Sequence, residues 1–268
     1  MLKKEIENYY KCGKERKRLF NGCAELERIR MLDIFHRYLP KAPATILDIG
    51  GGAGVYAFSL AKENYAVTLI DPMPLHIQQA MSIAKKLHSS VKIVQGDARQ
   101  VNEKDNSVDV VLLLGPLYHL TAKEDRLQAL KEAYRVLKPE GLIFAAGISC
   151  FASLITSIPK GLILNKDFSE IIKEDLNTGQ HRNPKNKFHY FTTAFFHHPQ
   201  QLKSEVIESG FCSVTLLGIE GPMLNIPEHR KIWHNPAVRK RILSFLRTIE
   251  TDESIIGASC HILAIGQK

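Results

Sequence analysis

Four glycines, at positions 50, 51, 52 and 54, follow a short β-branched run in the stretch ILDIGGGAG. Glycine lets the backbone approach a ligand closely, and the amides that open a following helix attract an anion. The dinucleotide fingerprint G-x-G-x-x-G, counted from Gly50 and Gly52, would need a glycine where Val55 stands. The glycines therefore indicate a ligand-binding loop with the spacing Asp-x-Gly-x-Gly-x-Gly, beginning at Asp48, and they disfavour NAD.

Two further aspartates stand where segments with strand character end. Asp71 closes YAVTLID, 21 residues after Gly50, and Asp97 comes shortly after VKIVQ. Ligands of open α/β sheets bind at the carboxyl ends of the strands, so these carboxylates and the glycine loop should meet at one edge. There Asp71 can accept hydrogen bonds from ribose hydroxyls, and Asp97 lies at the height of an adenine amino group. Either aspartate taken singly could instead be a helix cap or a turn residue.

The elements that must position these residues alternate between strand and helix. Short apolar or β-branched runs predict strands over 44–50, 65–71, 91–95, 108–114 and 142–149. Helical spacing predicts helices over about 3–19, 22–38 and 74–88. Thr121-x-x-Glu124 is a capping box that opens another helix, and the turn LKPEG ends it. Such alternation requires right-handed crossovers and predicts an α/β fold with an open, doubly wound, mostly parallel sheet.

The regular alternation stops after residue 150. Residues 151–197 carry scattered polar and aromatic side chains, which is typical of a lid or binding loop rather than of a linker. The pattern then predicts a helix over 199–209, a strand at CSVTLLGI and a final strand over 254–266. We therefore divide the chain into an N-terminal helical cover (1–40), a ligand-binding core (41–150), a lid (151–197) and a C-terminal part of the core (198–268) with a helical insertion at 221–250.

Composition sets the class of protein. The 268 residues are 44% hydrophobic and 24% charged, which is typical of a globular chain with a large core. The five cysteines form no Cys-x-x-Cys motif or Cys/His cluster, so we expect a reducing compartment and no metal. The charged start and the lack of a long apolar run predict a cytoplasmic protein without membrane insertion. The net charge of +8 permits nucleic acid, anionic lipid or an acidic small molecule as partner.

Five stretches, in this order along the chain, resemble the motifs of class I S-adenosylmethionine-dependent methyltransferases: ILDIGGGAG, VTLIDP, VQGDAR, SVDVVLLLGPLYHL and LKEAYRVLKPEGLIFAA. The chain is most similar to small-molecule enzymes of the ubiquinone/menaquinone-biosynthesis and glycine N-methyltransferase type. The resemblance implies a Rossmann-like, seven-stranded sheet whose last strand is antiparallel, a helical N-terminal segment and a lid after the fifth strand. It also implies S-adenosyl-L-methionine as methyl donor, S-adenosyl-L-homocysteine as product and a small-molecule methyl acceptor.

The resemblance also implies which residues contact the cofactor. It assigns the methionyl part to Gly50 and Gly52, the ribose to Asp71, and the adenine to Asp97 and Ala98. Pro72 is a further expected cofactor contact. Leu114 and Gly115 would border the sulfonium and the acceptor. Asp48 would order the loop or meet the cofactor's amino group through water.

The N-terminal helix carries further candidates. Tyr9, Tyr10 and Arg18 could cover the cofactor, and Arg18 could pair with its carboxylate through two parallel hydrogen bonds. The alternative is that Arg18 is a solvated charge on a basic helix.

Two neighbouring residues are candidates for catalysis. Methyl transfer is an in-line displacement at a sulfonium, so holding the nucleophile about 3–3.5 Å from the methyl group supplies much of the rate. A general base helps when the nucleophile is a hydroxyl or an ammonium, and His119 in GPLYHL lies beside the expected methyl position. Tyr118 could direct its phenol to the same place. One member of such a pair normally faces the core, so packing is the alternative for each.

The predicted lid is rich in histidine. If it folds over the cofactor, we expect His189, Tyr190 and His197 to contact the substrate. The alternative is that these histidines are ordinary surface side chains.

Two other functions compete with this interpretation. A nucleic-acid methyltransferase would use the basic segment 1–41, with 11 basic and 6 acidic side chains, as a phosphate footprint. In that family, methylation of a base amino group goes with the motif Asn/Asp-Pro-Pro-Tyr/Phe after the fourth strand. This chain has Gly-Pro-Leu-Tyr there and lacks the acidic position. We therefore expect a small-molecule acceptor and no nucleic-acid partner. A cofactor-binding protein without catalysis is the other alternative, because a fold does not prove turnover.

Overall fold

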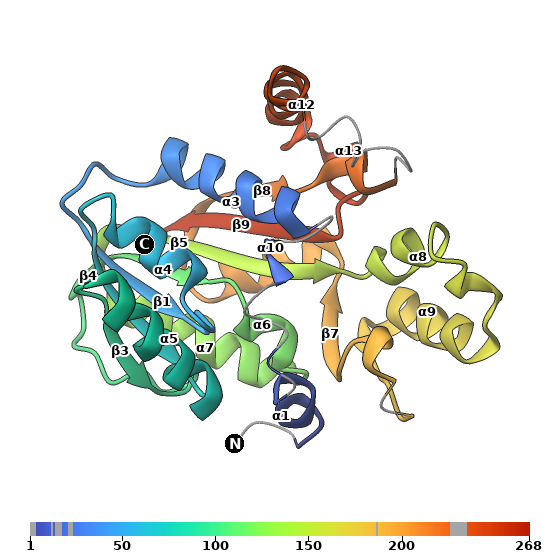
Figure 1. Ribbon diagram of the computed structural model, residues 1–268, viewed down its shortest axis with the longest axis horizontal. Coiled ribbons are helices and arrows are strands. Elements are labelled where there is room, and N and C mark those ends of the chain that lie inside the picture. Colours follow the sequence, from blue (N-terminus) through green and yellow to red (C-terminus); the bar gives the residue numbers. More distant parts are fainter. Residues whose placement is uncertain (1–3, 12, 14–17, 21–23, 186, 226–234) are drawn as a thin grey trace.

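The computed structural model describes residues 4–11, 13, 18–20, 24–185, 187–225 and 235–268. Its centre is a twisted sheet with helices on both faces (Figure 1). Among the described residues, no helix is long and apolar enough to cross a membrane.

Seven strands form the body of the sheet in the order β3-β2-β1-β4-β5-β9-β8. They are β1 (Thr45–Ile49), β2 (Ala66–Asp71), β3 (Lys92–Gln95), β4 (Val108–Leu113), β5 (Leu137–Ser149), β8 (Cys212–Gly218) and β9 (His261–Gln267). The strands β1 to β5 pair in parallel, and β9 runs antiparallel to both β5 and β8. The predicted mostly parallel sheet with an antiparallel last strand is therefore confirmed.

Alternate residues of the central strands point to opposite faces, because side chains alternate along a strand. Ile46 packs in the cluster that holds α3 (Ala24–Tyr38), α4 (Val55–Ala61) and α5 (Pro74–Leu87). Leu47 packs in the cluster that holds α7 (Lys123–Val136) and α10 (Pro199–Glu208). Both faces are buried, which explains the unbroken apolar run of β4 and confirms the doubly wound fold.

The segment after β5 is more regular than its sequence suggests. It contains α8 (Ala152–Ser157), η1 (Leu162–Leu164), α9 (Lys166–Thr178), β6 (Gln180–His181), η2 (Phe188–Tyr190) and β7 (Ala194–His197). β7 pairs in parallel with the end of β5, and β6 pairs antiparallel with β7. α8 and α9 lie at one end of the molecule, beyond the carboxyl end of β5 (Figure 1).

The remaining elements are α1 (Lys4–Tyr10), α6 (Pro116–His119), η3 (Gly221–Asn225), α12 (Pro236–Ile249) and α13 (Glu253–Ile256). One of them, α6, lies in the middle of the chain, and the others lie nearer its two ends. The short helix α6 follows β4 directly, so it begins at the edge of the sheet where ligands of this fold bind.

Three local predictions are wrong. The first helix ends at Tyr10 rather than near residue 19, and Gly13 has a left-handed φ of 67°; residues 12 and 14–17 of that prediction lie outside the described residues. Thr121 caps no helix, because α7 begins at Lys123 after Ala122 and without a side-chain cap. The last strand begins at His261, because Asp252 accepts a hydrogen bond from the Ser254 amide and opens α13 instead.

Candidate active site

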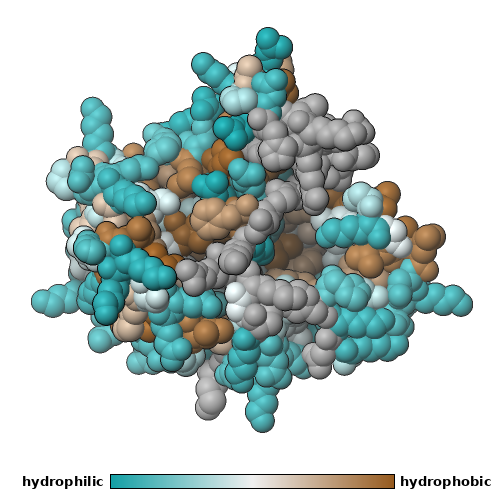
Figure 2. All heavy atoms as spheres, in the orientation of Figure 1, coloured by the Kyte–Doolittle hydropathy of each residue, from teal (hydrophilic) through white to brown (hydrophobic). Residues whose placement is uncertain are grey.

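One cavity opens at the carboxyl edge of the parallel strands, near the ends of β1, β2, β3 and β4. Both predicted catalytic residues and every predicted cofactor contact except Tyr9 line it: Tyr10, Arg18, Asp48, Gly50, Gly52, Asp71, Pro72, Asp97, Ala98, Leu114, Gly115, Tyr118 and His119. Figure 2 shows hydrophobic side chains around a hollow in the middle of one face of the molecule. The structure thus brings these residues together, whereas their roles stay predictions.

The glycine loop is held by its own backbone. The amides of Gly50 and Gly51 donate to the Ile70 carbonyl at 2.7 and 3.3 Å, which ties the loop to β2. Gly50 and Gly52 have φ values of 74° and 58°, a region that favours glycine. A Cβ at Gly50 would also lie 2.6 Å from Cδ of Pro116, so this position has no room for a side chain. The loop is therefore a fixed, side-chain-free wall of the cavity.

Asp48 lies under this loop with an unsatisfied oxygen. Its side chain is buried, and Oδ2 has no hydrogen-bond partner among the described residues. Burial, and secondly the negative charge of Asp71, raise the pKa of Asp48 to about 7. A cationic group in the cavity would relieve both effects, so the site fits a ligand that carries an ammonium or sulfonium charge.

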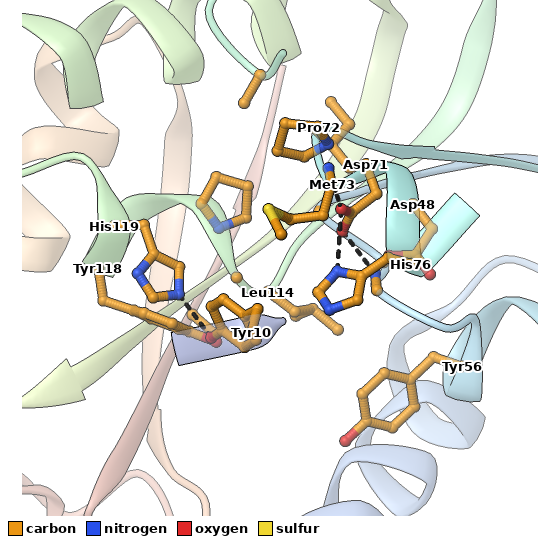
Figure 3. Close-up of a pocket in the computed structure, with 18 of the residues that line it drawn as sticks. Tyr10, Asp48, Tyr56, Asp71, Pro72, Met73, His76, Leu114, Tyr118 and His119 are labelled. Atoms are coloured by element: carbon orange, nitrogen blue, oxygen red, sulfur yellow. Dashed lines mark hydrogen bonds and ion pairs between the residues drawn. The ribbon is translucent and has the colours of Figure 1, made fainter. Parts of the chain in front are cut away.

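Asp71 is buried at the end of β2 and already accepts three hydrogen bonds (Figure 3). Oδ2 accepts from the Gly52 amide at 2.9 Å, and Oδ1 accepts from the Met73 amide at 2.8 Å. The third contact, 3.0 Å to Nδ1 of His76, was not predicted from the sequence. Because a carboxylate has about four acceptor positions, Asp71 has little capacity left for two ribose hydroxyls. Nε2 of His76 is buried without a partner among the described residues and lines the same cavity.

Asp97 is held by a neighbour that sequence reasoning missed. The Arg99 guanidinium donates to both oxygens of Asp97, at 3.0 and 2.7 Å, and also reaches Asp125 at 3.1 Å. These hydrogen bonds from Arg99 lower the pKa of Asp97 despite partial burial. Arg99 and Asp125 also line the cavity, so the predicted adenine end is an ion-paired wall rather than a lone carboxylate.

Tyr118 and His119 lie on α6 opposite the glycine loop, and α1 brings Tyr10 to them. The Tyr10 hydroxyl lies 2.8 Å from Nε2 of His119, and the Tyr118 and His119 ring centroids are 4.7 Å apart. Burial lowers the pKa of His119 to about 4, so the imidazole is neutral at physiological pH. The Tyr10 hydroxyl therefore shares a hydrogen bond with a neutral imidazole in the wall of the cavity, and the tautomer of His119 sets its direction.

Arg18 is only partly exposed, and it pairs with a protein carboxylate. Its Nη1 and Nη2 donate to the two oxygens of Glu27 at 2.6 and 3.1 Å. Glu27, Tyr56 and His261 also line the cavity and were not predicted. Glu27 belongs to α3, and a charged residue in a helix is usually part of its solvent-exposed face. The sequence therefore did not indicate that Glu27 lines the cavity.

The three predicted substrate contacts do not line the cavity. His189 is exposed. The Tyr190 ring packs against Phe168, with centroids 4.7 Å apart. His197 is fully buried, with Nε2 3.3 Å from Glu205, because β7 pairs with β5 and directs this side chain under α10. These placements correct the prediction that the three residues surround the acceptor.

The segment after β5 reaches the cavity wall through different residues. The Phe191 ring centroid lies 6.0 Å from that of His119 and 5.2 Å from that of Tyr9. The Thr193 hydroxyl donates a hydrogen bond to Glu5 of α1. α1 is therefore fastened to this segment on one side, while Tyr10 packs against His76 on the other, with ring centroids 5.2 Å apart.

The region that contributes many of the cavity residues is similar in sequence to known proteins. Residues 46–141 match a family model described as a methyltransferase domain. A ubiquinone/menaquinone biosynthesis C-methyltransferase of Rickettsia bellii is 35% identical over 117 residues, 41% of this chain and 46% of the relative. A glycine/sarcosine N-methyltransferase of Parasynechococcus marenigrum is 32% identical over 127 residues, 46% of this chain and 44% of the relative. The matched region thus spans a little under half of each of these relatives.

The fold is shared more widely. A crystal structure from Methanosarcina mazei, described as a SAM-dependent methyltransferase, superposes with a TM-score of 0.58 at 18% identity. The superposition covers 88% of this chain and 96% of that one. The likeness therefore extends beyond the matched domain to nearly the whole fold.

Proposed function

We propose that this chain, which matches a methyltransferase domain over residues 46–141 and shares the fold of a SAM-dependent methyltransferase, is a class I S-adenosylmethionine-dependent methyltransferase that methylates a small-molecule acceptor by in-line displacement. The observation that carries the proposal is the continuity of the cavity. The glycine loop, Asp71 and Asp97 line one part, and Tyr10, Tyr118 and His119 line the part beside Leu114. Donor and acceptor can therefore occupy one continuous space, as a direct transfer requires.

The residues of the cavity have separate tasks in this proposal. S-adenosylmethionine supplies the sulfonium-bound methyl group. Asp48 and the Gly50–Gly52 backbone hold the methionyl end, and Asp71 with His76 faces the ribose. Leu114 and Gly115 keep the reacting centre free of charged side chains. This arrangement catalyses mainly by positioning, because it holds the two reactants in line and excludes water.

In this proposal His119 orients the Tyr10 hydroxyl and does not act as a general base. Its pKa of about 4 means that a full positive charge on the imidazole is costly at neutral pH. In the tautomer that this proposal requires, with the proton on Nδ1, Nε2 accepts the hydrogen bond from Tyr10 and turns the lone pairs of the Tyr10 oxygen toward the acceptor space. In this proposal the acceptor hydroxyl or amine donates to Tyr10, while Tyr118 closes the opposite side.

Two measurements test the proposed function. Calorimetry should detect S-adenosylhomocysteine binding to the full chain, and NAD should not bind. Conversion of labelled S-adenosylmethionine should then be compared with three acceptor pools: a metabolite extract freed of macromolecules, total RNA and duplex DNA. Label transfer to the metabolite pool alone is expected. No binding of the cofactor product would reject the proposal, and label in RNA or DNA would favour a nucleic-acid methyltransferase.

A further inference from the structure

Four charged side chains form a cluster at the end of the cavity away from Asp97, and the proposed reaction does not use them. We call Arg18, Glu27, Glu220 and His261 the charged end cluster. His261 begins β9 and pairs with Ile148 of β5, while Glu220 follows β8. β9 lies two strands beyond β4, a step of about 4.8 Å for each strand. The cluster therefore lies past the expected methyl position, on the acceptor side of the cavity.

Arg18, Glu27 and His261 line the cavity, whereas Glu220 does not, and the two cations are the more exposed members of the cluster. The side chains of Arg18 and His261 are 35% and 25% exposed, against 11% for Glu27 and 1% for Glu220. Glu27 accepts two hydrogen bonds from the Arg18 guanidinium. Glu220 accepts from Nδ1 of His261 and, at 3.0 Å, from its backbone amide. This pairing fixes the His261 ring, so that Nε2 is the ring nitrogen turned away from Glu220.

The electrostatics make His261 a donor at this end of the cavity. Burial opposes a charge on the ring, but Glu27 and Glu220 outweigh it and raise the pKa of His261 to about 9. Glu27, Glu220 and His261 are also close enough to share a cation, with ligand atoms within 4.8 Å. The Arg18 guanidinium and the imidazolium proton already supply two positive charges there, so the cluster presents N–H donors instead.

The Tyr56 hydroxyl is an unsatisfied hydrogen-bonding group at the same end of the cavity, as judged from the described residues. The Tyr56 side chain lines the cavity and is 9% exposed, and its hydroxyl has no hydrogen-bond partner among the described residues. Figure 3 shows this hydroxyl directed away from Asp71 and His76. Glu27, Arg18 and Tyr118 are the charged or titratable groups that act on it most strongly. A buried hydroxyl is costly to leave unpaired, so this wall of the cavity suits a ligand oxygen.

We propose that the charged end cluster binds an anionic oxygen group, a carboxylate or a phosphate, on the methyl acceptor. His261 and Arg18 donate to this group, and the Tyr56 hydroxyl completes the subsite. The proposal rests on the proposed methyl transfer and narrows its acceptor to an acidic small molecule. Glu220 is a positioning residue, because it holds the His261 ring and does not face the cavity.

The test uses the full chain saturated with S-adenosylhomocysteine and labelled with ¹⁵N in histidine. Inorganic phosphate and acetate are titrated separately, and the Nε2 signal of His261 is identified by its loss in His261→Gln. We expect this signal to shift with either anion. Calorimetry should show phosphate binding weakened at least about tenfold in His261→Gln, as expected for the loss of one charge-assisted hydrogen bond. His36→Gln, an exposed histidine of α3 that pairs with Glu63, is the matched control and should bind phosphate unchanged.

A second variant, Tyr56→Phe, tests the proposal independently if His261→Gln fails to fold. Tyr56→Phe removes only the hydroxyl and should weaken phosphate binding several-fold while the cofactor product binds as before. Equal phosphate affinity in wild type, His261→Gln and Tyr56→Phe would overturn the proposal. It would also fall if His261→Gln weakened S-adenosylhomocysteine but not 5′-methylthioadenosine, because the subsite would then hold the cofactor's carboxylate. His261-dependent binding of Mn²⁺ would instead make the cluster a metal site.

Failure of the proposed function would look different. If the wild-type protein bound no S-adenosylhomocysteine, the methyltransferase proposal would fail first. Titration of phosphate into the ligand-free protein would then still decide whether the charged end cluster binds anions.

Discussion

The Tyr10 hydroxyl and Nε2 of His119 lie 2.8 Å apart, although 109 residues separate them in the chain. This contact joins the N-terminal helix α1 to the short helix after β4. It places one hydroxyl of the cover and one imidazole of the core at the same point of the cavity wall. The contact also makes the cover part of the proposed acceptor site rather than a passive lid.

Removal of the Tyr10 hydroxyl should slow the reaction more than it weakens cofactor binding. In Tyr10→Phe, we expect kcat to fall about tenfold, because the acceptor loses one positioning hydrogen bond, and a loss of about 1.4 kcal/mol is a factor of ten. The affinity for S-adenosylhomocysteine should stay within a few-fold. Tyr134→Phe, which makes the same change where the ring packs against Phe211, is the control. Equal losses of kcat in the two variants would contradict the role of Tyr10.

Replacement of Asp71 should affect both the ligand and the loop. Asp71→Ala removes the acceptor of three hydrogen bonds, including the one from the Gly52 amide. We expect S-adenosylhomocysteine to bind at least about tenfold more weakly and stability to fall by about 1–3 kcal/mol, since buried donors lose their partner. Calorimetry and denaturant unfolding measure the two effects. Asp105→Ala, which changes an exposed carboxylate, should alter neither, and full cofactor affinity in Asp71→Ala would remove Asp71 from the binding site.

The Asp48 carboxyl should make cofactor binding depend on pH. Burial and the charge of Asp71 raise its pKa to about 7, so a proton occupies Asp48 at pH 6 and leaves by pH 8. A cationic ligand favours the ionised form, and we therefore expect S-adenosylmethionine to bind more tightly at pH 8 than at pH 6, with proton release near pH 7. Calorimetry in buffers of different ionisation enthalpy measures this release. Asp48→Asn should bind with a flat pH profile, and an unchanged profile in that variant would assign the titration to another group.

The raised pKa of Asp48 also predicts how the free energy of unfolding changes with pH. A carboxyl whose folded pKa is raised stabilises the fold below its ordinary pKa near 4, and this contribution is lost as pH rises through 7. The free energy of unfolding should therefore fall between pH 4 and pH 7 by more in the wild type than in Asp48→Asn. Denaturant unfolding at several pH values checks this difference.

The N-terminal helix and the end of the predicted lid should respond together to the ligand. Glu5 bonds to Thr193, and Tyr9 packs against Phe191, so residues 4–11 and 187–197 form one contact. In hydrogen exchange, both should gain protection when S-adenosylhomocysteine binds, because closing segments lose their open states. The helix α12 (Pro236–Ile249) contributes no residue to the cavity and should not change. Protection of only one of the two segments would show that they do not close as a unit.

The cofactor side of the cavity could be predicted from the sequence, because short stretches of sequence determine where its residues lie. A β-branched run, a glycine loop and a helix occupy a few dozen consecutive residues, and a parallel sheet brings successive strand ends to one edge. Gly50, Asp71 and Asp97 therefore line one cavity as expected. The burial of β4 on both faces and the motifs of the family resemblance follow from patterns of the same short range, and the antiparallel last strand was implied by that resemblance.

The acceptor side depended on contacts between distant segments, and the tertiary structure decided it. The sequence marked His119 and Tyr10 separately, but only the packing of α1 on α6 joins them. The sequence favoured His197 as a substrate contact, but the pairing of β7 with β5 buries this side chain against Glu205. It carried no signal for His261, because a histidine that begins a strand gains its charge from Glu27 and Glu220, and these come from α3 and the end of β8. Local spacing fixes where a strand or loop ends, whereas the charge and contacts of a buried side chain depend on whichever distant segments pack around it.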